Sequence, residues 1–228
     1  MKKTTIKASA SRSTKRNANH KKPTAAGNVR IIGGQFKRRN INFIDADGLR
    51  PTPDRLRETL FNWLLADIHS ARVLDSCAGS GVLGFEALSR GAAHCTFIET
   101  NQAQYQMLLQ SAQQLKVDID SYQVFQGNAE QVLSQNSNFK HPFDIVFIDP
   151  PYAKDLWQPI LTALIEQLLI TTETLIYLEA DKDLNKQLAE LIESLSLLPA
   201  MQGLKRFECL KQTKVGQVVA GLYRLSSS

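Results

Sequence analysis

The chain has 228 residues, 43% of them hydrophobic, and a net charge of +5, which suits one sizeable α/β domain with an appendage. Its longest apolar runs fall far short of the roughly 20 residues that a transmembrane helix needs, and no secretory hydrophobic region follows the basic start, so we expect a cytoplasmic protein without a membrane partner. Three cysteines without CxxC spacing and four scattered histidines indicate neither a disulfide framework nor a metal site.

The basic residues are concentrated at the start of the chain. Residues 1–44 contain twelve Lys or Arg and no Asp or Glu, whereas the remaining residues carry a net charge of −7. Such a segment is typical of nucleic-acid-binding proteins, because each phosphate contact releases a condensed counterion, but it is equally typical of a solvated tail. Residues 1–28 are poor in apolar side chains, and we expect a disordered basic tail that adds salt-sensitive RNA affinity.

Residues 29–49 predict a small basic β-hairpin. Two apolar stretches flank Gly33 and Gly34, which indicates a two-residue glycine turn. Three consecutive basic residues at positions 37–39 are then expected on one strand, where they make its edge or tip strongly positive.

A helix is expected after this hairpin, at the start of a domain over residues 50–228. The prolines keep residues 50–53 extended, and an apolar stripe over residues 56–65 recurs at helical spacing. Thr52 or Asp54 is the expected N-cap.

Strands and helices alternate after residue 70. Strands are predicted at 71–76, 93–99, 121–126, 143–149 and 173–179, and helices at 81–91, 101–115, 128–134, 154–169 and 182–195. This alternation predicts an α/β fold with a mostly parallel sheet and helices on both faces. Two final stretches, 206–212 and 217–225, predict an antiparallel hairpin at or near the sheet edge, which brings the sheet to seven strands.

The loop that follows the first of these strands is rich in glycine. Glycines at 79, 81 and 84 let the backbone turn sharply and let a ligand approach the amino end of the next helix. Asp75 precedes Gly79 by four residues, and Glu99 ends the next strand, where it can accept hydrogen bonds from ribose hydroxyls. The glycine spacing also matches a dinucleotide-binding loop, and a turn without any ligand is the remaining reading.

A second candidate ligand contact follows the third strand of the alternating part. The side-chain oxygen of Asn128 can accept a hydrogen bond from an adenine amino group, and the Ala129 backbone lies beside it. Taken alone, an Asn after Gly127 is more often a turn residue and helix cap.

The motif Asp149-Pro150-Pro151-Tyr152 follows an apolar strand, at the sheet edge where α/β folds bind ligands. The Asp149 carboxylate and the Pro150 carbonyl can each accept one N–H of an aromatic amine, which orients its nitrogen and stabilises the positive charge that grows on it. Tyr152 can stack on a base that is unpaired or flipped out. A rigid turn without chemistry is the alternative interpretation.

These motifs carry a family resemblance. D-S-C-A-G-S-G (75–81), F-I-E (97–99) and D-P-P-Y (149–152) resemble the class I, Rossmann-like methyltransferases that modify amino groups of bases. The stretches R-P-T-P-D-R-L-R-E-T-L-F-N-W-L (50–64) and G-S-G-V-L-G-F-E-A-L-S-R-G-A (79–92) closely resemble the bacterial RsmD family, and the likeness spans about residues 29–225.

The resemblance implies transfer of a methyl group from S-adenosylmethionine to N2 of a specific guanine in 16S rRNA of the small ribosomal subunit, of the guanine-966 type, by a monomer that needs no metal. The implied catalytic residues are Asp149, Pro150, Pro151 and Tyr152. The implied cofactor-binding residues are Asp75, Cys77, Ala78, Gly79, Gly81, Glu99, Thr100, Asn128 and Ala129. The implied nucleic-acid-binding residues are Lys37, Arg38, Arg39, Arg50, Thr52, Arg55 and Arg57. The sequence departs from the family pattern at Cys77, where an aromatic residue is usual, and at Asn128, where Asp is usual.

Three other functions remain open at the level of sequence. An adenine-N6 or cytosine-N4 methyltransferase would use the same Asp-Pro-Pro-Tyr chemistry on DNA or RNA. An NAD-dependent oxidoreductase would explain the glycine loop, but it leaves the motif at 149–152 unexplained. An RNA-binding module without catalytic activity would explain the basic segment alone.

Overall fold

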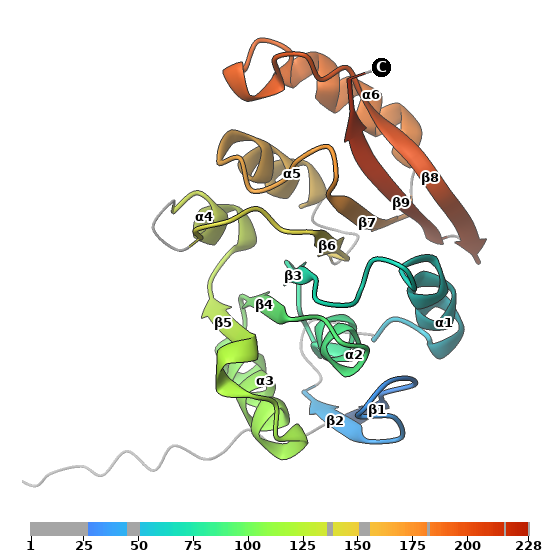
Figure 1. The fold of residues 1–228 in the computed structure, drawn as a ribbon, viewed down its shortest axis with the longest axis vertical. Helices are drawn as coiled ribbons and strands as arrows, with labels where there is room; N and C mark the ends of the chain where they lie inside the picture. Colours follow the sequence, from blue (N-terminus) through green and yellow to red (C-terminus); the bar gives the residue numbers. More distant parts are fainter. Residues whose placement is uncertain are drawn as a thin grey trace, which may run out of the picture.

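The computed structural model describes residues 27–44, 51–135, 139–150, 156–181, 183–216 and 218–227. A seven-stranded sheet in the order β5-β4-β3-β6-β7-β9-β8 forms its centre, and a separate two-stranded sheet, β1-β2, lies beside it (Figure 1). The strands of the large sheet are β3 (Arg72–Asp75), β4 (His94–Glu99), β5 (Tyr122–Gln126), β6 (Ile145–Ile148), β7 (Leu175–Ala180), β8 (Arg206–Val215) and β9 (Val218–Ser226). Strands β3 to β7 pair in parallel, as the alternating pattern predicted.

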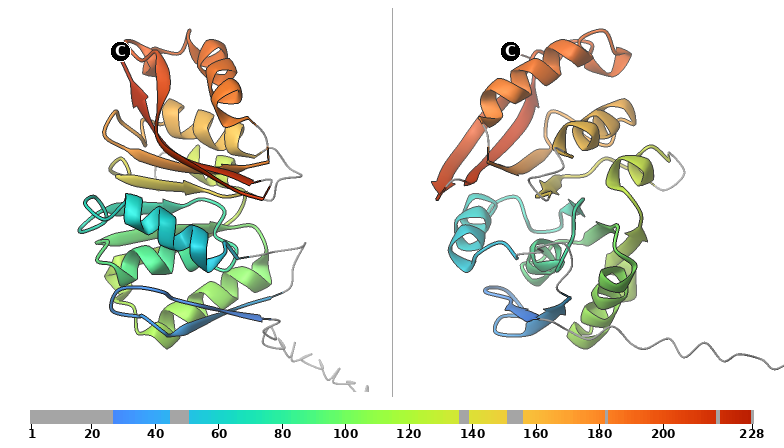
Figure 2. Two further views of the ribbon diagram at one scale, coloured as in Figure 1. Left: turned by 90° about the vertical axis from the view of Figure 1, so that its right-hand side faces the viewer. Right: turned by 180° about the vertical axis from the view of Figure 1, so that it is seen from behind.

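The sheet is covered by helices on both faces because successive side chains of a strand point to opposite sides. Val73, Ile145 and Phe147 pack against α1 and α2, whereas their sequence neighbours Leu74 and Val146 pack against the other helix layer. One layer holds α1 (Asp54–Trp63), α2 (Val82–Ser89) and α3 (Gln102–Leu115), and the other holds α4 (Ala129–Leu133), α5 (Trp157–Glu166) and α6 (Leu184–Leu195), as the two views of Figure 2 show. The predicted α/β class with helices on both faces is confirmed.

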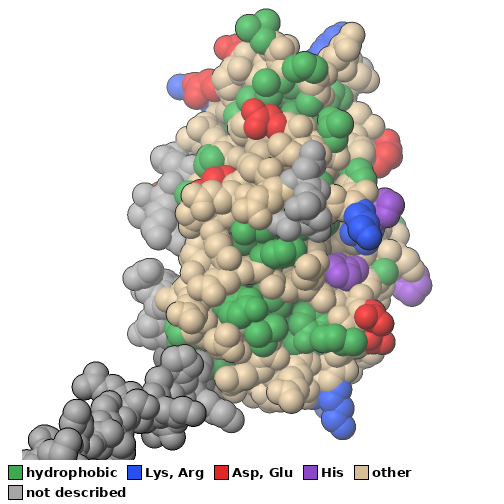
Figure 3. Space-filling model, turned by 90° about the vertical axis from the view of Figure 1, so that its left-hand side faces the viewer, with side chains coloured by type: hydrophobic (Ala, Val, Ile, Leu, Met, Phe, Trp, Pro, Cys, Tyr) green, Lys and Arg blue, Asp and Glu red, His purple; other side chains and the backbone are tan. Residues whose placement is uncertain are grey.

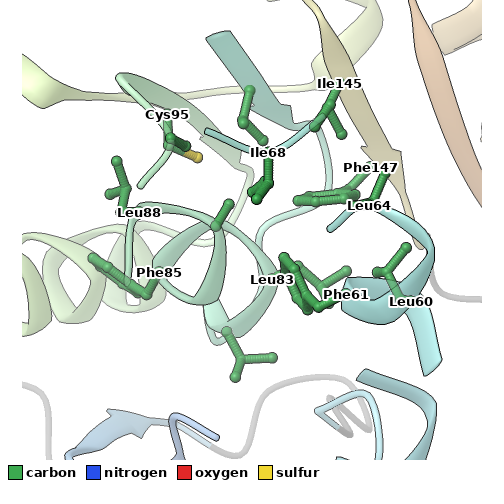
Figure 4. Close-up of a cluster of buried hydrophobic side chains, with 14 of the residues drawn as sticks. Leu60, Phe61, Leu64, Ile68, Leu83, Phe85, Leu88, Cys95, Ile145 and Phe147 are labelled. Atoms are coloured by element: carbon green, nitrogen blue, oxygen red, sulfur yellow. The ribbon is translucent and has the colours of Figure 1, made fainter. Parts of the chain in front are cut away.

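The core between α1, α2 and the sheet sets the position of the candidate site. Phe61 of α1 meets Phe147 of β6 edge to face, with 6.0 Å between ring centroids (Figure 4). Phe85 of α2 meets Phe97 of β4, with 4.8 Å between ring centroids. All four rings are buried. This packing fixes the starts of α1 and α2 over the carboxyl ends of β3 and β6.

The C-terminal hairpin forms as predicted, but with a shorter turn. Strand β9 pairs antiparallel with β7, and β8 forms the edge beyond it. The predicted turn at 213–216 is wrong, because residues 213–215 continue β8 and Val215 already pairs with Val218. Antiparallel insertion of the last strand leaves the sheet with β5 and β8 as its two edges.

The N-terminal hairpin differs from its prediction. Strands β1 (Gly27–Arg30) and β2 (Asn40–Phe43) pair antiparallel, and the connection runs over residues 31–39 rather than through a two-residue glycine turn. Gly34 has a φ of +69°, and a Cβ there would overlap the Ser89 carbonyl oxygen. The glycines therefore serve the close approach of this loop to the C-terminal end of α2, where Gln35 N donates to Ser89 O at 2.7 Å.

Helix α1 begins without the side-chain cap that the sequence suggested. Pro53 occupies the N-cap position, and no side chain caps the helix. Asp54 is already the first helical residue, and the Thr52 hydroxyl donates to Asp149 instead. Within the described ranges, no helix is both long and apolar enough to cross a membrane.

Candidate active site

Three carboxylates meet at the carboxyl edge of the sheet. Asp75 ends β3, Glu99 ends β4, and Asp149 directly follows β6. Asp75 pairs in register with Phe97 and with Phe147, so Glu99 and Asp149, each two residues farther along, point to the same face as Asp75. Because β3 lies between β4 and β6, Asp75 is flanked by the other two acids. Burial first, and then the charges of these two acids, raise the pKa of Asp75 to about 7.

The glycine loop is held by Asp75 at the start of α2. Asp75 Oδ2 accepts a hydrogen bond from Gly84 N at 3.0 Å. Gly79 and Gly81 both have positive φ, +49° and +75°, so the loop needs residues that adopt the left-handed region. A Cβ on Gly81 would also lie 2.9 Å from the Phe85 ring. The loop thus packs tightly against α2, and Gly79 is its partly exposed glycine.

Glu99 is oriented by donors from the chain itself. Its Oε2 accepts from Gly79 N at 2.9 Å, and its Oε1 accepts from Asn101 N at 2.7 Å and from the Thr100 hydroxyl at 3.4 Å. Burial raises the pKa of Glu99, and these hydrogen bonds partly oppose the rise. Oε2 keeps a further lone pair, and the hydrogen bond from Thr100 to Oε1 is long, so the carboxylate can still accept from ribose hydroxyls.

The remaining predicted cofactor contacts lie around the same edge. Ala78 is buried, and its N–H donates to Ile98 O at 2.9 Å, so the loop is tied to β4. Asn128 is exposed and precedes α4 without capping it through its side chain, and its contact with an adenine stays a prediction. Ala129 is buried at the first turn of α4. Cys77 is partly buried, and burial raises the pKa of its thiol, which favours the protonated form.

Of the predicted catalytic motif, the structure describes Asp149 and Pro150. Asp149 is partly buried, and its Oδ2 accepts from the Thr52 hydroxyl at 3.1 Å. Burial raises the pKa of Asp149 to about 6, and the hydrogen bond from Thr52 opposes the rise. The carboxyl group is therefore mostly ionised near pH 7 and is able to accept an N–H. Pro151, Tyr152 and the predicted contact Arg50 lie outside the described residues.

Arg57 corrects one prediction about the nucleic-acid interface. Its side chain is fully buried, donates to Thr52 O and Arg30 O, and pairs with Glu86 at 3.4 Å and Asp54 at 2.5 Å. The expectation that Arg57 contacts nucleic acid is wrong, because no part of the guanidinium reaches the surface. Arg57 instead ties the β1-β2 hairpin to α1 and α2.

Two further residues of the site had no assigned role in the sequence. Glu86 is fully buried in α2, where it accepts from Ile32 N at 2.9 Å and pairs with Arg90 at 2.9 Å. A single acid in an otherwise apolar helix was a signal that could have revealed it. The hydroxyl of Ser76, within the glycine loop, donates to Phe147 O at 2.8 Å and fastens the loop to β6.

The other predicted nucleic-acid contacts are spread over the hairpin and α1. Lys37 and Arg38 are exposed in the loop 31–39, not on a strand as expected. Arg39 stacks on Phe36 and donates to the Leu115 carbonyl at the end of α3, so its charge is partly used within the fold. Arg55 is exposed on α1.

An open groove of about 570 Å³ runs along the hairpin. It is lined by Asn28, Val29, Arg30, Arg38, Asn40 and Asp54. The face in Figure 3, by contrast, shows only a few separate Lys and Arg side chains among the described residues. The hairpin contributes two basic side chains, Arg30 and Arg38, to the groove. Within the described part of the chain, no group of three or more His, Cys, Asp or Glu side chains is arranged to hold a metal ion.

Comparisons with known proteins agree with this geometry. Residues 29–223 match the family described as "Conserved hypothetical protein 95". The chain is 40% identical to the Ribosomal RNA small subunit methyltransferase D of Escherichia coli over 206 residues, which cover 90% of this chain and 94% of that protein.

Solved structures show the same likeness. A putative methyltransferase from Escherichia coli superposes with a TM-score of 0.69 at 35% identity, covering 89% of this chain and all of that one. A putative methyltransferase complexed with S-adenosylhomocysteine, SMU.776, shares the fold alone, with a TM-score of 0.57 at 17% identity over 81% of this chain and 53% of that chain.

The residues at the carboxyl edge fit S-adenosylmethionine on three counts. The glycine loop turns at the start of α2, Glu99 offers oriented acceptors, and Asp75 lies beside them as a carboxyl group whose ionised form a ligand with sulfonium and ammonium groups would favour. The chain belongs to the family that residues 29–223 match, the RsmD-type methyltransferases, and S-adenosylmethionine is its methyl donor.

Proposed function

We propose that the protein methylates the exocyclic N2 amine of one guanine in 16S rRNA, within the small ribosomal subunit. An rRNA substrate is supported by the name of the Escherichia coli relative. The amine as acceptor is supported by a single observation on this chain: an ionisable carboxylate, Asp149, followed by a proline, Pro150, at the sheet edge beside the cofactor loop.

The chemistry asks for acceptors rather than for a strong base. The lone pair of an aromatic amine is delocalised into the ring, so the amine is a weak nucleophile. An Asp149 carboxylate that accepts one N–H, with the Pro150 carbonyl accepting the other, would localise the lone pair and stabilise the positive charge on nitrogen. Bound S-adenosylmethionine supplies an electrophilic methyl group on its sulfonium. As the N–C bond forms, the bond between the methyl group and sulfur breaks, and its electron pair stays on sulfur as a neutral thioether. The methylated nitrogen becomes more acidic, and Asp149 can hold its proton before water takes it.

Access to Asp149 requires that the guanine leave its stack. The base must be unpaired or flipped out, because the N2 amine is shared with cytosine in a Watson–Crick pair. Stacking of Tyr152 on this base stays a prediction, as does contact of Lys37, Arg38, Arg50 and Arg55 with RNA phosphates. The basic segment 1–28 is proposed to add affinity that weakens with salt.

Nucleoside mapping tests the proposal. Small subunits and naked 16S rRNA that lack the modification are incubated with the protein and methyl-labelled cofactor, and the RNA is digested and separated. We expect N2-methylguanosine as the labelled product. Label in N6-methyladenosine or N4-methylcytidine would contradict the assignment of the base, and label in DNA but not in RNA would contradict the substrate class.

An aspartate pair tests the role of the carboxylate. We expect Asp149→Ala to abolish methyl transfer while cofactor affinity stays within a few-fold of wild type. Asp144 is the matched control. It lies just before the amino end of β6, whereas Asp149 follows the carboxyl end, and it accepts a hydrogen bond from Arg72 N at 2.7 Å. Asp144→Ala should keep transfer. Near-normal turnover in Asp149→Ala would rule out the proposed role.

A further inference from the structure

The catalytic carboxylate has a partner that comes from a distant part of the chain. Thr52 lies two residues before α1, is 5% exposed, and donates through Oγ1 to Asp149 Oδ2 at 3.1 Å. Across the residues that the structure describes, Thr52 is the hydrogen-bond donor to this carboxylate. The bond leaves Oδ1 of Asp149 without a described partner.

We propose that Thr52 is a positioning residue, whose hydroxyl fixes the orientation of the Asp149 carboxylate and directs Oδ1 to the incoming amine. This inference rests on the function proposed above and deepens it. It replaces the expectation that Thr52 contacts nucleic acid, because a side chain this buried offers almost no surface to RNA.

The backbone around Thr52 is rigidly held. Arg57 donates from Nε to Thr52 O at 3.1 Å, and Leu56 N and Arg57 N both donate to Pro53 O at 3.0 Å. The guanidinium of Arg57 is itself fully buried and paired with Glu86. The backbone of Thr52 is thus anchored to the packed α1–α2 layer, which keeps its hydroxyl beside Asp149.

The hydroxyl affects both geometry and charge. A carboxylate rotates easily about its last bond, and a donor fixed on one oxygen restricts that rotation. A hydroxyl that donates to a carboxylate also favours the ionised form, which is the form able to accept an amine N–H. Burial alone would raise the pKa of Asp149 further, so loss of the hydroxyl should reduce the ionised fraction near pH 6.

Thr52→Val removes the hydroxyl and retains the shape. We expect kcat to fall by about tenfold or more, with KM for RNA and Kd for S-adenosylmethionine within about threefold of wild type. The acidic limb of the kcat–pH profile should move upward by roughly one pH unit. Thr52→Ser keeps the hydroxyl donor, so its kcat and the acidic limb of its kcat–pH profile should resemble those of wild type.

Thr174→Val is the matched control for loss of a buried threonine hydroxyl. Thr174 is 1% exposed and donates to Phe143 O at 2.7 Å, just before β7 and away from the catalytic edge. We expect it to lower the melting temperature without shifting the pH profile. If Thr52→Val behaves like this control, with a lower melting temperature and an unmoved acidic limb, the positioning role is overturned.

A second readout does not depend on turnover. With ¹³C-labelled aspartate, the Asp149 carboxyl signal is assigned by its loss in Asp149→Asn and is titrated in wild type, Thr52→Val and Thr52→Ser. We expect the midpoint to rise in the valine variant alone. An equal midpoint in all three overturns the inference. If the wild-type protein methylates no guanine, the proposed function fails, and this titration still decides whether Thr52 controls the ionisation of Asp149.

Discussion

Replacing Glu86 by leucine should lower the free energy of unfolding strongly, although the two side chains are similar in volume. It is fully buried in α2 and accepts from Ile32 N at 2.9 Å. It also faces two guanidinium groups, Arg57 at 3.4 Å and Arg90 at 2.9 Å. Glu86→Leu leaves the Ile32 N–H without its acceptor and leaves Arg57, which is fully buried, with Asp54 as its remaining carboxylate.

The magnitude follows from these contacts. Removing one partner of a buried ion pair costs about 3–5 kcal/mol, and a buried donor left without an acceptor costs about 1–3 kcal/mol. Because Asp54 still compensates Arg57, we expect a total near the lower end of this sum, about 4 kcal/mol in the free energy of unfolding. For a domain of this size, that corresponds to a fall of about 10 °C in Tm.

Urea denaturation measures the effect. The midpoint should fall for Glu86→Leu at an unchanged m-value, and Glu86→Gln, which keeps an acceptor for Ile32 N, should lose less. Arg57→Met combined with Glu86→Leu should cost at least about 1 kcal/mol less than the two single changes added together, because the pair is coupled. A Glu86→Leu variant within about 0.5 kcal/mol of wild type would refute the view that this pair holds the hairpin to α1 and α2.

Two further predictions concern the cofactor loop. The pKa of Asp75 is raised to about 7, and a ligand with sulfonium and ammonium groups would favour its charged form. Binding of S-adenosylmethionine should therefore release a proton, and its affinity should increase from pH 5.5 to about pH 7. Calorimetry in buffers of different ionisation enthalpy checks this, and equal affinities at pH 5.5 and 7.5 would speak against it. Gly84→Ala should lower the free energy of unfolding by about 1–3 kcal/mol, because a Cβ there would overlap the Phe97 ring and lie 2.7 Å from Cys95 Sγ. A variant with an unchanged or higher melting temperature would show that α2 is not packed against β4 as closely as described.

The sequence determined the architecture and the edge at which the site lies. Alternation of short apolar strands with helices is sufficient for a parallel sheet, and Asp75, Glu99 and Asp149 each end or follow a strand. Parallel strands place their carboxyl ends at one edge, so these acids had to meet there. The motifs at 75–81 and 149–152 also indicated the class of methyltransferase and its cofactor, because glycine and proline act through local backbone geometry. The stretches 50–64 and 79–92 carried the narrower family resemblance.

Only the tertiary structure decided how that site is held. In the sequence, Thr52 fitted either a helix cap or an RNA contact, and Arg57 fitted an RNA contact. Nothing local shows that they lie against Asp149 and Glu86, 97 and 29 residues away. Gly33 and Gly34 read as a turn, since the helix end they approach is more than 50 residues distant. The spacing of apolar residues and the residue types that favour turns are local properties of the chain. The partner of a buried polar group depends instead on how elements far apart in the sequence pack together.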